Sequence, residues 1–193
     1  MKKLNPKEII LPIVVLLVIC VGVTAILASV NNLTKEPIAQ QTQQKAEQAR
    51  AVVLPNAESF EQIPAELDGV SEVCKGLKNG ETVGYTFTAS SNGYGGAVEV
   101  MVGIDSKSGE ISGVSILSQG ETPGLGANAV KSEFTDQYKQ NAQEITVIKN
   151  AAPKDGEIEA LTGATITSRA VTNAVNSAVK AYEEIEKGGE ELG

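Results

Sequence analysis

The sequence predicts an α+β protein, in which a single N-terminal transmembrane helix is followed by an extracytoplasmic domain with a mainly antiparallel sheet and flanking helices. Three observations support this class: residues 9–30 are apolar and uncharged, residues 83–118 alternate between apolar and other side chains, and residues 168–182 repeat apolar side chains at helical spacing. Strands that come first, with helices interspersed and at the end, are typical of α+β architecture. We expect an N-terminal segment and transmembrane helix at 1–30, a juxtamembrane stalk at 31–56, a folded domain at 57–186 and a flexible acidic tail at 187–193.

The membrane anchor is predicted from the run between Ile9 and Val30, which is long enough to cross the hydrocarbon core. Pro12 lies in the first turn, where its missing N–H costs little. A cleaved signal peptide is the alternative, but its apolar stretch is usually only about 7–15 residues long. Lysines precede the run and favour a cytoplasmic N-terminus. We therefore expect a single-pass protein of the cytoplasmic (inner) membrane, held in the lipid by one helix, with its C-terminal domain outside.

The first elements after the anchor are a helix and three strands. Residues 34–52 are rich in Gln, Ala and Lys and predict a stalk helix that ends at "LPN". Segments 83–90, 95–105 and 110–118 have the apolar content and alternation of strands, and "SKSG" marks a turn between the last two. These three strands predict an antiparallel meander.

The second half of the domain is predicted to be more helical. Residues 128–139 suit a helix, and residues 144–150 suit a short strand. From Ser168 onward, apolar residues recur at positions i, i+3 and i+4, which predicts a long amphipathic helix. The helix at 128–139 is expected to carry three apolar side chains on one side: Val130, Phe134 and Tyr138.

Composition excludes several kinds of chemistry. The formal net charge is −8 and the pI about 4.7, so we expect no nucleic-acid partner, because such binding needs a basic face. The chain contains no histidine, which removes histidine-based triads and nearly all zinc sites. Cys20 and Cys74 are too few for an iron–sulfur cluster. Redox chemistry in this protein therefore requires an organic cofactor, and no metal site is expected.

Two glycine-rich segments carry more polar chemistry than a connection needs. The first, "SNGYGG" at 91–96, is either a wide hairpin loop or a loop that admits a planar ligand, with Tyr94 available for stacking. The second, "SQGETPGLG" at 118–126, places Leu125 between two glycines beside Glu121 and Thr122. Turn structure explains these glycines but not the leucine between them, which is expected to be exposed unless a flat ligand covers it. Both interpretations remain open for both segments.

The third segment, "LTGATITSRA" at 161–170, groups small hydroxyl side chains at the start of the last helix. Helix N-termini bind phosphate well, and Gly163 and Ala164 are small enough to let a phosphate lie against the backbone. The alternative is that Thr167 or Ser168 simply caps the helix. A threonine hydroxyl is a poor nucleophile, and the chain offers no histidine as its base, so covalent modification requires another enzyme.

These segments resemble a known family. "TGATIT" at 162–167 resembles the flavinylation motif, in which a dedicated flavin transferase esterifies the phosphate of FMN onto the last hydroxyl residue. "GYGG" and "ETPGLG" resemble the other hallmarks of the FMN-binding domain in the G subunit of the Rnf electron-transport complex, a ferredoxin:NAD⁺ oxidoreductase. The same domain occurs in the C subunit of the sodium-translocating NADH:quinone reductase. The resemblance covers essentially the whole chain.

The resemblance implies an electron-carrier subunit of an ion-translocating oxidoreductase complex, which is not catalytic alone and works with the other membrane subunits. FMN is expected on Thr167 through a phosphoester made by a flavin transferase, with Thr165 as a phosphate ligand or helix cap. The alternatives are a component like the C subunit of the quinone reductase, a stand-alone extracytoplasmic flavoprotein, and an anchored binding module without a cofactor. The expected cofactor-binding residues are Thr167, Thr165, Gly163, Ala164, Glu121, Thr122, Gly124, Leu125, Gly126 and Tyr94.

Overall fold

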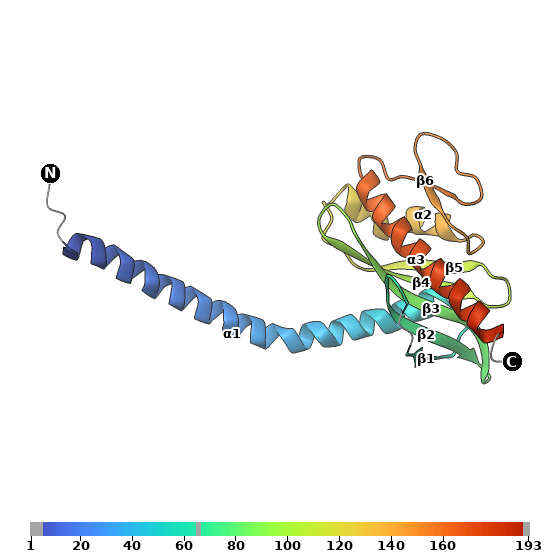
Figure 1. Ribbon diagram of the computed structural model, residues 1–193, viewed down its shortest axis with the longest axis horizontal. Coiled ribbons are helices and arrows are strands. Elements are labelled where there is room, and N and C mark those ends of the chain that lie inside the picture. Colours follow the sequence, from blue (N-terminus) through green and yellow to red (C-terminus); the bar gives the residue numbers. More distant parts are fainter. Residues whose placement is uncertain (1–5, 65–66, 191–193) are drawn as a thin grey trace. The chain divides into compact units, whose positions relative to one another are not determined.

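The computed structural model describes residues 6–64 and 67–190 of the chain. It contains two compact units, Met1–Gln44 and Lys45–Gly193, each of which is described by itself. Figure 1 shows the first unit as helix and the second as a sheet with helices packed on it. The predicted α+β class and mainly antiparallel sheet are confirmed.

The N-terminal helix α1 runs from Pro6 to Val53 without interruption. Pro12 and Pro37 both lie inside it, and the apolar side chains between positions 10 and 38 are exposed. Among the described residues, this is the one helix long and apolar enough to cross a membrane, judged by length and composition. The predicted anchor and stalk are thus parts of one helix, whose last turns, from residue 45 onward, belong to the second unit.

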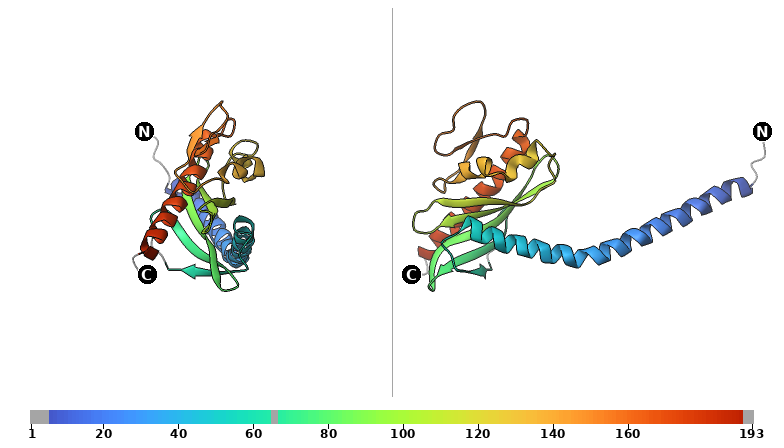
Figure 2. Two further views of the ribbon diagram at one scale, coloured as in Figure 1. Left: turned by 90° about the vertical axis from the view of Figure 1, so that its right-hand side faces the viewer. Right: turned by 180° about the vertical axis from the view of Figure 1, so that it is seen from behind.

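The second unit is built on one five-stranded antiparallel sheet in which every strand pairs with its neighbour in the sequence. Figures 1 and 2 show this meander from three sides. The last three strands correspond to the three that the sequence predicts, and the first two were not predicted. The strands are β1 (Ser59–Ile63), β2 (Val70–Lys78), β3 (Glu81–Asn92), β4 (Ala97–Asp105) and β5 (Ile111–Ser118).

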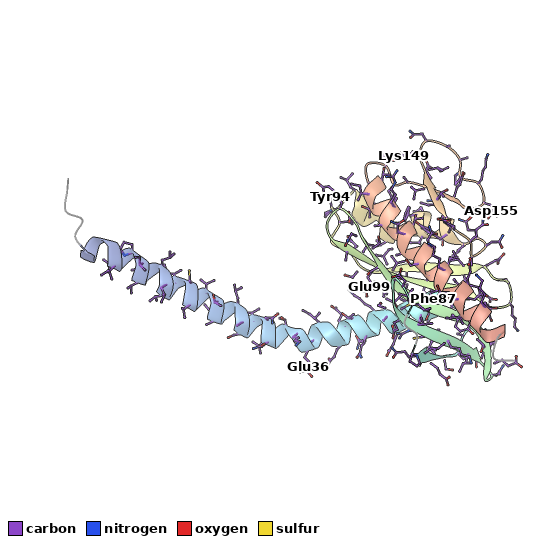
Figure 3. The ribbon with its side chains drawn as sticks, in the orientation of Figure 1. Glu36, Phe87, Tyr94, Glu99, Lys149 and Asp155 are labelled. Carbon is purple, nitrogen blue, oxygen red and sulfur yellow. The ribbon has the colours of Figure 1, made fainter. Side chains whose placement is uncertain are left out.

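The C-terminal helix α3 (Thr165–Glu190) covers one face of the sheet and forms the main core with it. Val100 and Val102 of β4 and Phe87 of β3 are fully buried against this helix layer, and Figure 3 labels Phe87 between the sheet and α3. The apolar face predicted from the helical spacing is buried, as expected from that pattern. The helix also reaches into the segment predicted as the acidic tail, of which residues 191–193 lie outside the described part.

The opposite face of the sheet receives the end of α1. Side chains alternate across a strand, so Met101 of β4 points away from α3 and packs against Ala49 and Val53 instead. A Cβ built on Gly103 would lie 2.2 Å from the backbone oxygen of Val53, and one on Gly113 would lie 2.9 Å from its Cα. The absence of side chains at these two positions is what lets the helix end lie directly on the sheet.

The segment between β5 and α3 is less regular than the sequence predicts. In place of one helix at 128–139, the chain forms η1 (Gly126–Val130), α2 (Ser132–Thr135) and η2 (Asp136–Tyr138). Lys131 is extended and interrupts the helical turns, so Phe134 and Tyr138 are buried while Val130 stays exposed.

The strand predicted at 144–150 is present as β6 (Thr146–Ile148). It pairs in parallel with β7 (Glu157–Glu159), a short strand that the sequence did not predict. The two strands form a separate ladder beside the start of the C-terminal helix (Figure 1).

Candidate functional site

The β3–β4 hairpin, the loop after β5 and the residues leading into α3 enclose a cavity of about 660 Å³. Figure 3 labels Tyr94 and Lys149, which line it from the hairpin and from the end of β6. Segments far apart in the sequence thus meet at one end of the sheet. Nine residues predicted from the sequence line the cavity: Tyr94, Glu121, Thr122, Leu125, Gly126, Gly163, Ala164, Thr165 and Thr167.

The sequence did not single out the remaining residues of the lining. Most come from β7 and the turn after it, which are too short and too irregular to carry a periodic signal. These residues are Lys149, Asn150, Glu159, Ala160, Leu161, Thr162 and Ile166. Gly124 was predicted for the site but lines an adjoining cavity of about 630 Å³, which shares Leu125 with the first.

The start of α3 forms the floor of the cavity. Gly163 has a φ of +75°, a left-handed conformation that glycine adopts readily, and α3 begins two residues later at Thr165. The Ser168 N–H donates to the Ala164 carbonyl at 3.0 Å, so the amides of residues 165–167 are the orphan donors of this helix start. Such amides, aided by the helix dipole, form a site suited to a phosphate group.

The alternative that Thr167 or Ser168 is the N-cap of the last helix is wrong, because both residues lie inside α3 and not before it. The Ser168 hydroxyl donates to the Ala164 carbonyl and accepts the Leu161 N–H, each at 3.0 Å. It therefore ties the incoming turn to the helix. Thr167 has a different partner.

The Thr167 hydroxyl donates a hydrogen bond of 2.7 Å to Oε2 of Glu121. Both side chains are buried, since Thr167 is 1% exposed and Glu121 is 6% exposed. The other carboxylate oxygen, Oε1, accepts the Gly95 N–H at 3.0 Å. One carboxylate therefore connects the hairpin loop, the loop after β5 and the first turn of α3.

Close backbone approach around Glu121 explains several of the glycines. A Cβ on Gly93 would lie 2.2 Å from Oε1 of Glu121, and one on Gly95 would lie 2.0 Å from the backbone oxygen of Gly120. A Cβ on Gly126 would lie 2.4 Å from the Thr167 hydroxyl oxygen and 2.6 Å from Oε2 of Glu121. Because these glycines have no Cβ, the neighbouring backbone and the buried carboxylate can approach them closely.

The rim of the cavity is apolar and open to solvent. Tyr94 is 74% exposed, Ile166 is 55% exposed and Leu125 is 45% exposed, although all three are large apolar side chains. Exposed apolar groups gathered around one cavity are typical of ligand sites. Leu125 is indeed exposed between its glycines, as the sequence suggested.

The charged groups of the lining are few. Its described residues include one cation, Lys149, and two carboxylates, Glu121 and Glu159. Lys149 and Glu159 are more open to solvent, whereas Glu121 is buried against Thr167. The cavity therefore combines a helix start with orphan amides, one lysine of the lining and an apolar rim. These residues suit a flat aromatic molecule with a phosphate at one end, and the volume lies within the roughly 300–1,000 Å³ of small-molecule sites.

Comparison with known proteins agrees with this chemistry. The FMN-binding domain family matches residues 93–180, and the RnfG N-terminal region matches residues 1–53. The G subunit of the Na⁺-translocating ferredoxin:NAD⁺ oxidoreductase complex of Acetobacterium woodii is 38% identical, over 90% of this chain and 91% of that protein. The chain belongs to the family of G subunits of ion-translocating oxidoreductase complexes. The family resemblance noted in the sequence is thereby confirmed.

Further members of this RnfG family match over most of their length. The G subunit of the proton-translocating ferredoxin:NAD⁺ oxidoreductase complex of Clostridium ljungdahlii is 38% identical, over 80% of this chain and 81% of that protein. The G subunit of an ion-translocating oxidoreductase complex of Methanosarcina acetivorans is 32% identical, over 91% of this chain and 95% of its own. Together with the exposed apolar helix α1, membership of the RnfG family supports single-pass anchoring in a membrane.

A solved structure shares the fold of this RnfG family member. The crystal structure of Shewanella oneidensis NqrC superposes with a TM-score of 0.50 and 20% sequence identity, covering 66% of this chain and 65% of that one. The similarity concerns the fold alone.

Proposed function

We propose that this chain is the electron-transfer subunit of an ion-translocating ferredoxin:NAD⁺ oxidoreductase complex and that it carries FMN joined through its phosphate to Thr167. The curated relatives bear the names of such complexes, and the FMN-binding family model spans the residues that build the cavity. When bound, the flavin supplies one- and two-electron redox chemistry. The chain positions it and relays electrons, while oxidation of ferredoxin and reduction of NAD⁺ belong to other subunits.

The observation that carries this proposal is the position of the Thr167 hydroxyl. It lies in the first turn of the helix and lines a cavity whose rim is apolar. A phosphate on this oxygen lies beside the orphan amides of α3 and within the cavity that Lys149 also lines. Thr165 and Gly163 then border the phosphate, and Leu125, Ile166 and Tyr94 offer apolar cover for the ring system.

We place the N-terminus in the cytoplasm because lysines precede the apolar run, and the cavity-bearing unit outside the membrane. A flavin held only by noncovalent contacts there is lost by dissociation, which favours a covalent link. A flavin transferase makes that link, and the remaining membrane subunits of the complex are the partners.

Three other functions make different predictions. The similarity of fold to NqrC favours a subunit of a quinone-reducing complex as the second candidate. Neighbouring genes distinguish the two, because a ferredoxin:NAD⁺ oxidoreductase subunit is encoded beside ferredoxin-like and membrane subunits. A stand-alone flavoprotein has neither set of neighbours. A cofactor-free binding module gives colourless protein even after co-expression with a flavin transferase.

The test is intact mass spectrometry of the full chain co-expressed with a flavin transferase. We expect the wild-type protein to carry one added FMN less water, to be yellow, and to fluoresce in a denaturing gel. Thr167→Ala should abolish the adduct, whereas Thr165→Ala, in the same helical turn and on the same lining, should keep it. An adduct that survives in Thr167→Ala refutes the assignment of this hydroxyl. No adduct on the wild-type chain refutes covalent attachment.

A further inference from the structure

We propose that Glu121 accepts the proton of the Thr167 hydroxyl when the flavin phosphate is attached, an inference that rests on the proposed function. The two residues are 46 positions apart, so their contact is a product of the fold. It joins a buried carboxylate to the hydroxyl whose oxygen has to form the new bond. A threonine needs such a base, and the chain contains no histidine to provide one.

The geometry already directs the proton toward the carboxylate. The hydroxyl donates to Oε2 at 2.7 Å, within the range for proton transfer along a hydrogen bond. Oε1 is held by the Gly95 N–H, which fixes the carboxylate plane and leaves Oε2 facing Thr167. Among the described residues Glu121 forms no salt bridge, so no cation competes for its lone pairs.

The attachment step balances with this assignment. The donor is a flavin whose phosphate is part of a phosphoanhydride, the chemical class of flavin adenine dinucleotide. The Thr167 oxygen forms a bond to the flavin phosphorus, and the anhydride P–O bond breaks. A nucleoside monophosphate leaves with that electron pair. The hydroxyl proton passes to Oε2 of Glu121, and no oxidant or reductant is required.

The product state also favours this destination for the proton. Once Thr167 is esterified, its oxygen has no hydrogen to donate, and a charged Glu121 would face an anionic phosphodiester with no donor left for its buried Oε2. A carboxylate in that position repels the phosphate. Glu121 that has kept the proton can instead donate a hydrogen bond to a phosphoryl oxygen.

The experiment compares attachment rates on the flavin-free full chain, purified in detergent, with purified flavin transferase and flavin adenine dinucleotide both saturating. The adduct is counted by intact mass at successive times. Glu121→Gln is the decisive variant, because the amide oxygen can still accept the Gly95 N–H and the NH₂ group can still contact Thr167, while no proton acceptor remains. Glu121→Asp keeps the carboxylate on a shorter stem. Glu61→Gln is the matched control, since it removes an exposed carboxylate on β1 that lines neither cavity.

We expect Glu121→Gln to slow attachment by about 100-fold or more, the usual contribution of a positioned base, while it melts like the wild type. Glu121→Asp should recover part of that rate, and Glu61→Gln should match the wild type. Wild-type rates in a folded Glu121→Gln, or equal slowing by Gln and Asp, would overturn the role of Glu121. Failure of the wild-type chain to take up flavin would instead reject the proposed function.

Discussion

Replacing Thr167 by valine tests the buried hydrogen bond in the flavin-free protein. Valine keeps the branched shape of threonine, so the main change is the loss of the 2.7 Å bond to Oε2 of Glu121. Glu121 is only 6% exposed, and water cannot easily replace the missing donor. A hydrogen bond to a charged group contributes about 1.5–3 kcal/mol. We therefore expect the free energy of unfolding to fall by about 2 kcal/mol, which lowers Tm by about 4–8 °C in a chain of this size.

The assay is thermal melting of the full chain in detergent, expressed without a flavin transferase. Near-UV circular dichroism of the tyrosines reports the second unit, since the chain has no tryptophan. Thr165→Val is the matched control, because Thr165 lines the same cavity in the same turn but is half-buried, and its change should stay within about 0.5 kcal/mol. Equal melting temperatures for the two variants would show that Thr167 is not bonded to Glu121 in solution.

Three further changes test the cavity rim, the contact between the end of α1 and the sheet, and the turn after β4. Leu125→Ala should keep the covalent flavin but shift its absorption spectrum through loss of apolar cover, and an unshifted spectrum would remove Leu125 from the site. Gly103→Ala forces a Cβ to within 2.2 Å of the Val53 backbone oxygen. Urea denaturation should therefore show a free energy of unfolding lower by about 3 kcal/mol, and an unchanged urea midpoint would contradict the contact. Partial burial acts to raise the pKa of Asp105. The hydrogen bonds that its carboxylate accepts from backbone amides, including the Ser108 N–H, outweigh this effect and hold the pKa below its ordinary value of 3.8. Wild type should therefore exceed Asp105→Asn in stability above that pH, with the difference vanishing as pH falls through the lowered pKa; a gap that persists in acid would refute this.

The sequence predicted the elements with strong periodicity and missed those without it. The face of α3 that follows helical spacing is buried as expected, and the three alternating segments are strands. In β2, Gly76 interrupts the alternation because it makes room for Leu54 from the end of α1, a requirement that only the tertiary structure reveals. β7 is three residues long, too short for a periodic pattern, and it was missed, whereas β6, of the same length, was predicted within 144–150.

Most residues of the candidate site could be predicted from the sequence, but the contacts between them could not. Motif resemblance identified Thr167 and Glu121 separately, yet their hydrogen bond joins positions 46 apart and follows from the fold alone. The sequence also left Thr167 as a helix cap among its alternatives, which the start of α3 at Thr165 excludes. Lys149 was missed because its role depends on where the short parallel ladder ends. The covalent bond itself stays a prediction.

The close packing of Val53 on Gly103 and Gly113 determines where the chain can be truncated to give a soluble protein. A soluble version that begins at Lys45 keeps Ala49 and Val53 in place over the second face of the sheet. One that begins at residue 57, where the amino-acid pattern alone suggests the boundary, uncovers Met101 and a strip of bare glycine backbone. Solvent-exposed apolar surface of that kind promotes association between copies of the chain. Soluble expression should therefore retain the final turns of α1 and discard only what lies before them.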